Sequence, residues 1–266
     1  MGSVHLLVLL MLCIPSAAQA GTAPPPQRIC KTGPDTYRIG SVDLDAARRE
    51  IRCSGRVNMA EGGPIELLAC LPHGKTHETV LTLDLVPMDL QLSLLLLGLS
   101  PGRNPAVHYR PGSPSAQRPP GDTVLLSVQW RTPGDDGAEP AVRTVPAESL
   151  LLNVQTGKPA AGVRWVFLGS RLAEGRFGAD LDGSIITTFH DPLAILEIAE
   201  ETANDDIYYN ANADLCPPVG TPVVLIIRVP PAEDAPAQGP RDEPSRVPPV
   251  PEEKEEHHAQ DVEGGG

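Results

Sequence analysis

Two histidines four residues apart make residues 68–80 the first candidate for chemistry. In the stretch LACLPHGKTHETV, His73 and His77 are followed directly by Glu78. If this stretch were helical, the two histidines would lie on one face. Zinc sites of the H-E-x-x-H type depend on two histidines on one helix face, with a glutamate that acts as a general base. The pattern therefore raises the question of a metal-dependent hydrolase.

The same stretch also carries the signals of a turn. Pro72 and Gly74 interrupt it, and it lies between two strand-like runs. In a turn, residues four apart do not converge on one face. Both interpretations stay open. The candidate polar site consists of Lys75, Thr76, His77 and Glu78. The metal alternative has His73, His77 and Glu78 as ligands of a divalent metal such as zinc, with His108, His190 or Asp191 completing the set.

Three other motif matches fail on physical grounds. The string GLSPG at residues 98–102 resembles a nucleophile elbow, but Pro101 has no N–H to donate to an oxyanion. The GKT of a phosphate loop lacks its earlier glycine, because Ala69 occupies that position. The stretch DLDG at residues 180–183 begins like a calcium loop, but its twelfth position is Asp191 and not glutamate. The DLDG stretch predicts a hairpin turn instead. None of the three motifs therefore provides a catalytic residue.

The cysteines predict disulfides. Four follow residue 20, namely Cys30, Cys53, Cys70 and Cys216. Their spacing matches no zinc or iron–sulfur motif, since those need closely spaced pairs. In a protein outside the cytoplasm an even number favours one or two disulfides, and the pairing stays open. Buried thiols are the second interpretation and a metal is the third.

Both ends of the chain differ from the middle. Residues 1–20 contain an apolar run followed by the small residues of a cleavage site, which predicts a secretory signal peptide, with an uncleaved anchor as the alternative. Residues 21–29 are expected to be a flexible linker. Residues 230–266 hold ten acidic and three basic residues with many prolines, which predicts a disordered acidic tail. After signal cleavage we expect no transmembrane span.

Residues 30–229 are long enough for one domain with its own core. The whole chain has a net charge of −13 and only 3% aromatic residues. Nucleic-acid binding requires a basic surface and stacking rings, so this class of partner is excluded.

The middle of the chain predicts an α+β fold. We expect a single strand-rich domain with a mostly antiparallel sheet, one buried helix, and a second short helix after Pro146 as an option. The leucine-rich run that begins at Pro87 and ends at Gly98 has helix start and stop signals. The expected strands are Glu50–Val57, Ile65–Leu71, Val80–Leu85, Val107–Tyr109, Val124–Arg131, Ala141–Val145, Val163–Leu168, Ser184–Phe189 and Pro222–Val229.

Five stretches carry a resemblance to a known family. They are EGGPIELLAC, GKTHETVLTLDLVPMDLQLSLLLLGL, LLLNVQTGKP, WVFLGS and PPVGTPVVLIIRV. In this order they resemble the YdjY-domain proteins, a family of bacterial secreted and envelope proteins, and the resemblance covers nearly all of residues 30–229. It implies one domain, a mixed strand-rich fold and an envelope setting. It implies no particular reaction, and it draws attention to Lys75, Thr76, His77 and Glu78.

These observations predict a secreted or periplasmic protein of the bacterial cell envelope. We expect a non-enzymatic binding or structural module without a cofactor, whose partner is an envelope or extracellular protein or polymer. The alternative is a metal-binding protein or metal-dependent hydrolase centred on His77 and Glu78.

Overall fold

A computed structural model of the protein describes residues 28–102, 121–133 and 139–230. The chain divides into two units, residues 1–229 and residues 230–266, and all elements below belong to the first unit. Four predictions concern residues outside the described ranges: the signal peptide, nearly all of the linker, the strand Val107–Tyr109 and the acidic tail beyond Pro230.

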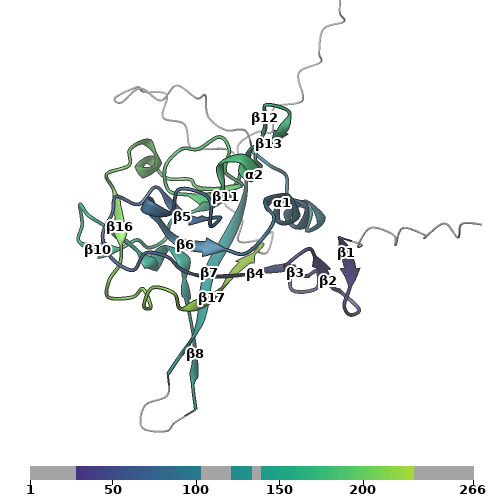
Figure 1. Ribbon diagram of the computed structural model, residues 1–266, viewed down its shortest axis with the longest axis horizontal. Coiled ribbons are helices and arrows are strands. Elements are labelled where there is room, and N and C mark those ends of the chain that lie inside the picture. The colour runs from purple at the N-terminus through teal and green to yellow at the C-terminus, as the bar shows by residue number, and fades with distance from the viewer. Residues whose placement is uncertain (1–27, 103–120, 134–138, 231–266) are drawn as a thin grey trace, which may run out of the picture. The chain divides into compact units, whose positions relative to one another are not determined.

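Eight strands close into a barrel (Figure 1). In spatial order they are β4 (Glu50–Val57), β17 (Pro222–Arg228), β7 (Asp122–Thr132), β11 (Trp165–Phe167), β15 (Leu196–Ile198), β14 (Ser184–Thr187), β5 (Leu67–Cys70) and β6 (Thr79–Leu83). Strand β6 also pairs with β4, which closes the ring. The pairs are antiparallel except β14 with β15 and β5 with β6, which are parallel.

The closed barrel corrects the expected α+β fold. Strands hold 42% of the described residues and helical segments 14%, so the domain is mostly β. A single strand-rich domain with mostly antiparallel pairs was expected correctly, but closure was not. Closure depends on Gly55 in β4, because a Cβ atom there would lie 2.3 Å from the Thr82 carbonyl oxygen of β6. The absent side chain lets the two backbones pair, and sequence alone does not show which strand approaches a glycine.

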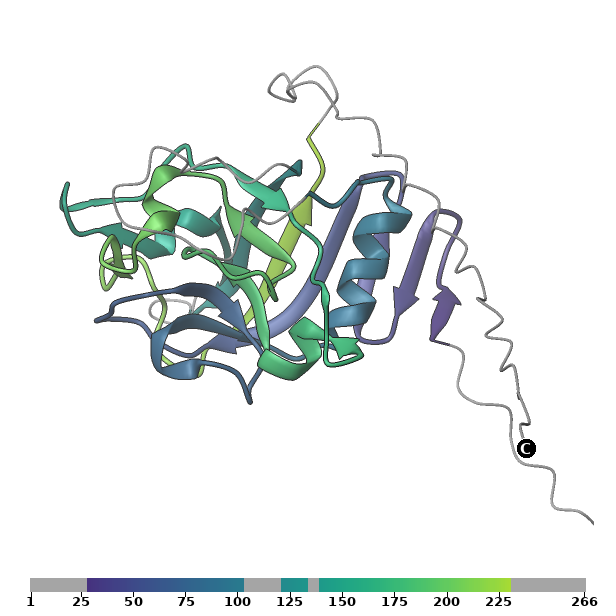
Figure 2. The same ribbon diagram turned by 90° about the horizontal axis from the view of Figure 1, so that it is seen from above.

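Three strands extend the sheet beyond the barrel, and one helix packs beside them. They are β1 (Ile29–Lys31), β2 (Thr36–Ile39), β3 (Val42–Asp45) and α1 (Pro87–Leu96). Strand β3 pairs with the first residues of β4, and α1 packs against β2 and β3 (Figure 2). The predicted helix is present, but it is not buried on every side. Leu90 and Leu94 lie in the core, whereas Leu95 and Leu96 are exposed, because the sheet covers only one face of the helix.

The remaining elements are short. They are β8 (Ala141–Pro146), which pairs with β7; β9 (Leu151–Asn153), β10 (Lys158–Pro159) and β16 (Tyr209–Ala211), which form a three-stranded sheet; the hairpin β12 (Leu172–Ala173) and β13 (Arg176–Phe177); α2 (Gly178–Asp182); and the 3₁₀ helices η1 (Thr76–Glu78), η3 (Ala147–Leu150) and η4 (Glu201–Asn204). None of the helices in the described part of the chain has the length and hydrophobicity of a membrane span.

Two local predictions need correction. The optional second helix after Pro146 is the single 3₁₀ turn η3, because the next residues pair as β9 with β16. The predicted hairpin turn at residues 180–183 is the end of helix α2. Gly183 has a φ of +79° and forms the left-handed cap of that helix, a role that favours glycine.

The side chains of β4 alternate between the core and the outer face of the barrel. Along β4, Ile51, Cys53 and Val57 are buried, whereas Arg52 and Arg56 are solvent-accessible. Because side chains alternate between the two faces of a strand, the first three point into the barrel and the arginines point outward. Strand β17 lies next to it, with Val223, Leu225 and Ile227 buried and Pro222, Val224 and Arg228 more accessible.

Candidate functional site

The segment with the two histidines forms the connection between β5 and β6. His73 Nε2 lies 3.4 Å from the carbonyl oxygen of Asp180 in α2. His77 Nε2 lies 3.6 Å from Glu78 Oε2, and the His77 side chain is 78% exposed. The two histidines therefore contact different partners, and the segment is not an α-helix that would align them. Thr76 contributes its carbonyl oxygen, which accepts a hydrogen bond of 2.7 Å from Asn58 Nδ2.

Lys75 is the charged centre of this connection. Its Nζ lies 3.5 Å from Glu66 Oε2 and 3.7 Å from Glu78 Oε1. Burial lowers the pKa of Lys75, but the charges of Asp191, Glu66, Glu78 and Asp182 raise it by more, so its pKa is raised overall. Lys75 is therefore held as a cation and is unsuited to act as a base or nucleophile at neutral pH.

The carboxyl groups around Lys75 do not fit a divalent metal well. Burial raises the pKa of Glu66, and the hydrogen bond and charge of Glu78 raise it further. A metal ion bound by Glu78 would face the ammonium group of Lys75, which disfavours it electrostatically. Among the described residues, no group of three or more His, Cys, Asp or Glu side chains is arranged to hold a metal. His108 lies outside these residues, and the zinc alternative stays a prediction.

His190, in the turn after β14, belongs to a separate buried polar cluster. Its Nδ1 hydrogen-bonds to Glu197 Oε1, and its Nε2 lies 2.9 Å from Asn204 Oδ1. Burial raises the pKa of Glu197 more than His190 lowers it. Burial lowers the pKa of His190, but the hydrogen bond and charge of Glu197 raise it by more. Because both pKa values are raised, the His190–Glu197 pair retains a proton. Asp191, next in sequence, acts through its charge on Lys75.

Glu197 was not found by sequence reasoning. It lies in the apolar stretch AILEIA, is completely buried, and its Oε2 has no hydrogen-bond partner within the described residues. A lone glutamate inside a run of buried strand residues is the signal that could have identified it, because such a charge needs a partner.

The cysteines are spread over the domain. Cys53 and Cys70 are buried, and Cys216 is partly buried. Cys30 is exposed on the edge strand β1. Burial raises the pKa of Cys53 to about 12 and that of Cys216 to about 11, and it also raises the pKa of Cys70. Protonated thiols are poor nucleophiles, so these three cysteines have no catalytic character. The disulfides stay a prediction.

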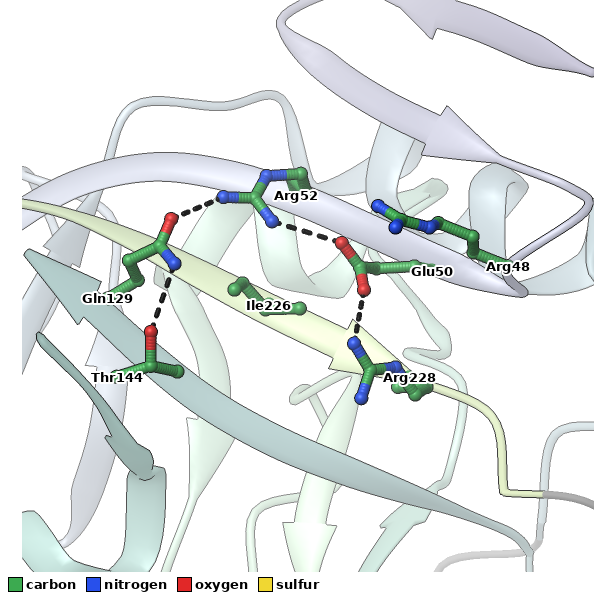
Figure 3. Close-up of a pocket in the computed structure, with 7 residues that line it drawn as sticks. All are labelled: Arg48, Glu50, Arg52, Gln129, Thr144, Ile226 and Arg228. Atoms are coloured by element: carbon green, nitrogen blue, oxygen red, sulfur yellow. Dashed lines mark hydrogen bonds and ion pairs between the residues drawn. The ribbon is translucent and has the colours of Figure 1, made fainter. Parts of the chain in front are cut away.

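A charged site lies on the outer face of the barrel, over β4, β17, β7 and β8. It is a pocket of about 440 Å³, which we call the arginine pocket (Figure 3). Its lining residues are Arg48, Glu50, Arg52, Gln129, Thr144, Ile226 and Arg228. Three positive charges thus surround one negative charge, in a chain whose net charge is −13.

Glu50 organises two of these arginines. It is only 4% exposed, and its carboxylate accepts hydrogen bonds from Arg52 Nη1 at 3.0 Å and Arg228 Nη2 at 2.5 Å. Burial raises the pKa of Glu50, but the two arginines lower it by more, so its pKa is lowered overall. Glu50 is therefore ionised at neutral pH and holds both guanidinium groups in place.

A second set of contacts fixes the other side of the pocket. Arg52 Nη2 donates to Gln129 Oε1 at 2.6 Å, and Gln129 Nε2 donates to Thr144 Oγ1 at 2.9 Å. Figure 3 shows this chain of contacts running across three strands to Glu50. Within the described residues, the guanidinium of Arg48 has no ion pair or hydrogen bond, although it lines the same pocket.

Sequence reasoning missed the arginine pocket. The alternation of Glu50, Arg52 and Arg56 with buried residues in β4 was a usable signal for an outward charged row. The contribution of Arg228 was not visible, since it depends on β17 pairing with β4 from 178 positions away.

Comparison with known families assigns residues 42–228 to the YdjY domain. This match covers more than half of the chain, so the protein belongs to the YdjY domain family, and the resemblance noted in the sequence is confirmed. No curated protein and no solved structure matches the chain.

Proposed function

We propose that this YdjY-domain protein is a non-enzymatic binding module of the bacterial cell envelope or extracellular space, and that it binds carboxylate groups in the arginine pocket. The observation that carries the proposal is the arrangement of Arg48, Arg52 and Arg228 around one buried carboxylate. Guanidinium groups bind carboxylates through paired hydrogen bonds, which gives both affinity and geometry.

The arginines retain capacity for a ligand. The side chains of Arg52 and Arg228 are 38% and 56% exposed, and a guanidinium has five N–H donors, more than their contacts with Glu50 and Gln129 use. Arg48 engages no partner among the described residues. One internal carboxylate holds the cluster together without neutralising it, so the pocket keeps two net positive charges for an anionic ligand.

The envelope setting is supported by the sequence. Residues 1–20 have the pattern of a secretory signal peptide, and the members that this chain resembles are secreted or envelope proteins. A binding role is supported by the raised pKa values of the Cys53, Cys70 and Cys216 thiols and by the raised pKa of Lys75, because nucleophilic catalysis needs the deprotonated forms of these groups.

The test measures binding of citrate to the full chain by titration calorimetry at low ionic strength. Citrate serves as a simple carboxylate probe. The key variant is Arg48→Gln, because Arg48 holds no other described side chain and its loss leaves the fold intact. Arg176→Gln is the matched control, since it removes the same charge from an exposed position in the β12–β13 hairpin.

We expect Arg48→Gln to weaken citrate binding about tenfold, as the loss of a charge-assisted hydrogen bond implies, and Arg176→Gln to change it less than twofold. If the two variants lose affinity equally, the effect comes from net charge and the pocket is not the binding site. Absence of citrate binding to the unsubstituted protein would refute the proposal.

A further inference from the structure

A second hollow continues the arginine pocket along the outer face of the same strands. It has a volume of about 630 Å³, and Gln129 lines both hollows. Arg56 of β4 stands on one side of it and Arg131 of β7 on the other. The two hollows adjoin at Gln129, and we call the surface that they cover over β4, β17, β7 and β8 the outer groove.

The floor of the outer groove is aliphatic. Pro222, Val224 and Ile226 occupy alternate positions of β17 and line the two hollows. The aromatic residue of the lining is Trp130, which is 5% exposed and carries Arg143 above its ring at 5.4 Å. This ring offers no open face on which a sugar could stack. The floor therefore suits aliphatic side chains better than carbohydrate rings.

The two arginines of β4 stand at a fixed distance from each other along the strand. Arg52 and Arg56 are four residues apart on one strand, which corresponds to about 13 Å. The β4–β17 register places Arg52 beside Ile226, Ser54 beside Val224 and Arg56 beside Pro222. The apolar side chain of Val224 thus lies beside the strand position midway between the two arginines.

An extended polypeptide has the same rise per residue as a strand. Acidic residues at its first and fifth positions therefore match Arg52 and Arg56, and an apolar residue at its third position meets Val224. All three side chains point to the same side of an extended chain. Charge, spacing and apolar floor are complementary to this one pattern.

We propose that the outer groove binds an extended segment of an acidic partner polypeptide with the pattern acid-x-apolar-x-acid. This proposal rests on carboxylate binding in the arginine pocket and names the ligand class. Arg56 has one competing contact, an ion pair with Asp84 at 3.4 Å in which both side chains are about half exposed. Such surface pairs are weak and exchange readily for a better placed carboxylate.

The experiment compares two blocked peptides of five residues with the same composition. The spanning peptide has glutamate at the first and fifth positions, valine at the third and serine between. The compact peptide has both glutamates adjacent at one end. Binding to the full chain is measured by fluorescence anisotropy for the unsubstituted protein, for Arg48→Gln, Arg56→Gln and Val224→Thr, and for Arg176→Gln as control. A melting curve for each variant verifies folding.

We expect the spanning peptide to bind about tenfold more tightly than the compact peptide, because it engages a second guanidinium. Arg56→Gln and Val224→Thr should remove most of this difference without changing citrate binding, whereas Arg48→Gln should weaken all three probes. Val224→Thr keeps the shape of the side chain and removes only its apolar character.

Two results would overturn the proposal while leaving carboxylate binding intact. One is equal affinity of both peptides with dependence on Arg48 alone. The other is a polygalacturonate chain that binds more tightly than the spanning peptide and depends on Arg56, since the occupant would then be a glycan. If neither peptide nor citrate depends on Arg48, the proposed function itself fails.

Discussion

Replacing Glu50 by glutamine should have opposite effects on stability and on ligand binding. Glu50 holds Arg52 and Arg228, so its charge stabilises the fold. It also competes with an incoming carboxylate for the same guanidinium groups. The substitution Glu50→Gln keeps the shape of the side chain but raises the charge of the arginine pocket from two to three. One residue thus separates the structural contribution of the cluster from its binding contribution.

The stability loss follows from the two hydrogen bonds. A hydrogen bond to a charged group contributes about 1.5–3 kcal/mol, but both arginines are more than a third exposed, and exposed ion pairs contribute about 0–1 kcal/mol each. We therefore expect a loss of about 2 kcal/mol in the free energy of unfolding, or about 4–8 °C in melting temperature for a domain of this size. Because the pKa of Glu50 is lowered in the fold, this difference should disappear as the pH falls through that pKa.

The binding gain follows from Coulomb's law. A ligand carboxylate that shares the guanidinium groups of Arg52 and Arg228 lies roughly 6 Å from the Glu50 carboxylate. At that separation the repulsion is about 0.7 kcal/mol in water and about 2.8 kcal/mol near a protein surface. Salt screening favours the lower part of this range, so citrate should bind about fivefold more tightly to Glu50→Gln. Weaker binding by the variant would refute the reasoning, because Glu50 would then be needed to form the site.

Two further substitutions test the buried pair and the metal alternative. The pKa values of His190 and Glu197 are both raised in the fold, so the contribution of each group to stability is complete below its own ordinary pKa and is lost as the pH rises through its raised pKa. Glu197→Gln should destabilise the fold by about 3 kcal/mol and flatten the fall in melting temperature as the pH rises above the ordinary histidine pKa; an unchanged slope would show that the pair does not hold the proton. Elemental analysis of protein purified without chelators or a histidine tag should find no stoichiometric zinc, iron or copper, because Lys75 stands beside the acids. A stoichiometric metal that is lost in His77→Ala would reinstate the hydrolase alternative.

A strand could be predicted when its pattern of apolar and polar residues is visible within its own stretch of sequence. Strand β4 begins and ends where the sequence indicates, because buried and accessible residues alternate along it from Ile51 onward. Strands β1, β2 and β3 were missed, since they are short and hold few large apolar residues. They are stabilised by pairing with β4 and by the packing of α1. Such tertiary contributions have no counterpart in a sequence window.

In the candidate site, too, local features could be predicted and long-range contributions could not. The turn character of the segment around Lys75 could be read from Pro72 and Gly74, because both residues act on the local backbone. The arginine pocket could not be predicted, since its charges come from β4, from the turn before it and from β17, which is far away in the sequence. A charge pattern on one strand predicts that a face is polar, but only the register of its neighbours decides whether the charges form a cluster.

The barrel explains why the binding surface lies outside it. Ile51, Cys53 and Val57 of β4 and Val223, Leu225 and Ile227 of β17 point inward and pack into one core. Along these two strands a partner can therefore reach only the outward positions, and these recur at every second residue. The spacing of Arg52 and Arg56 follows from this alternation. The floor residues of β17 are spaced in the same way. An extended polypeptide is built with the same repeat, so the outer groove selects a partner whose charges are spaced by the geometry of a strand.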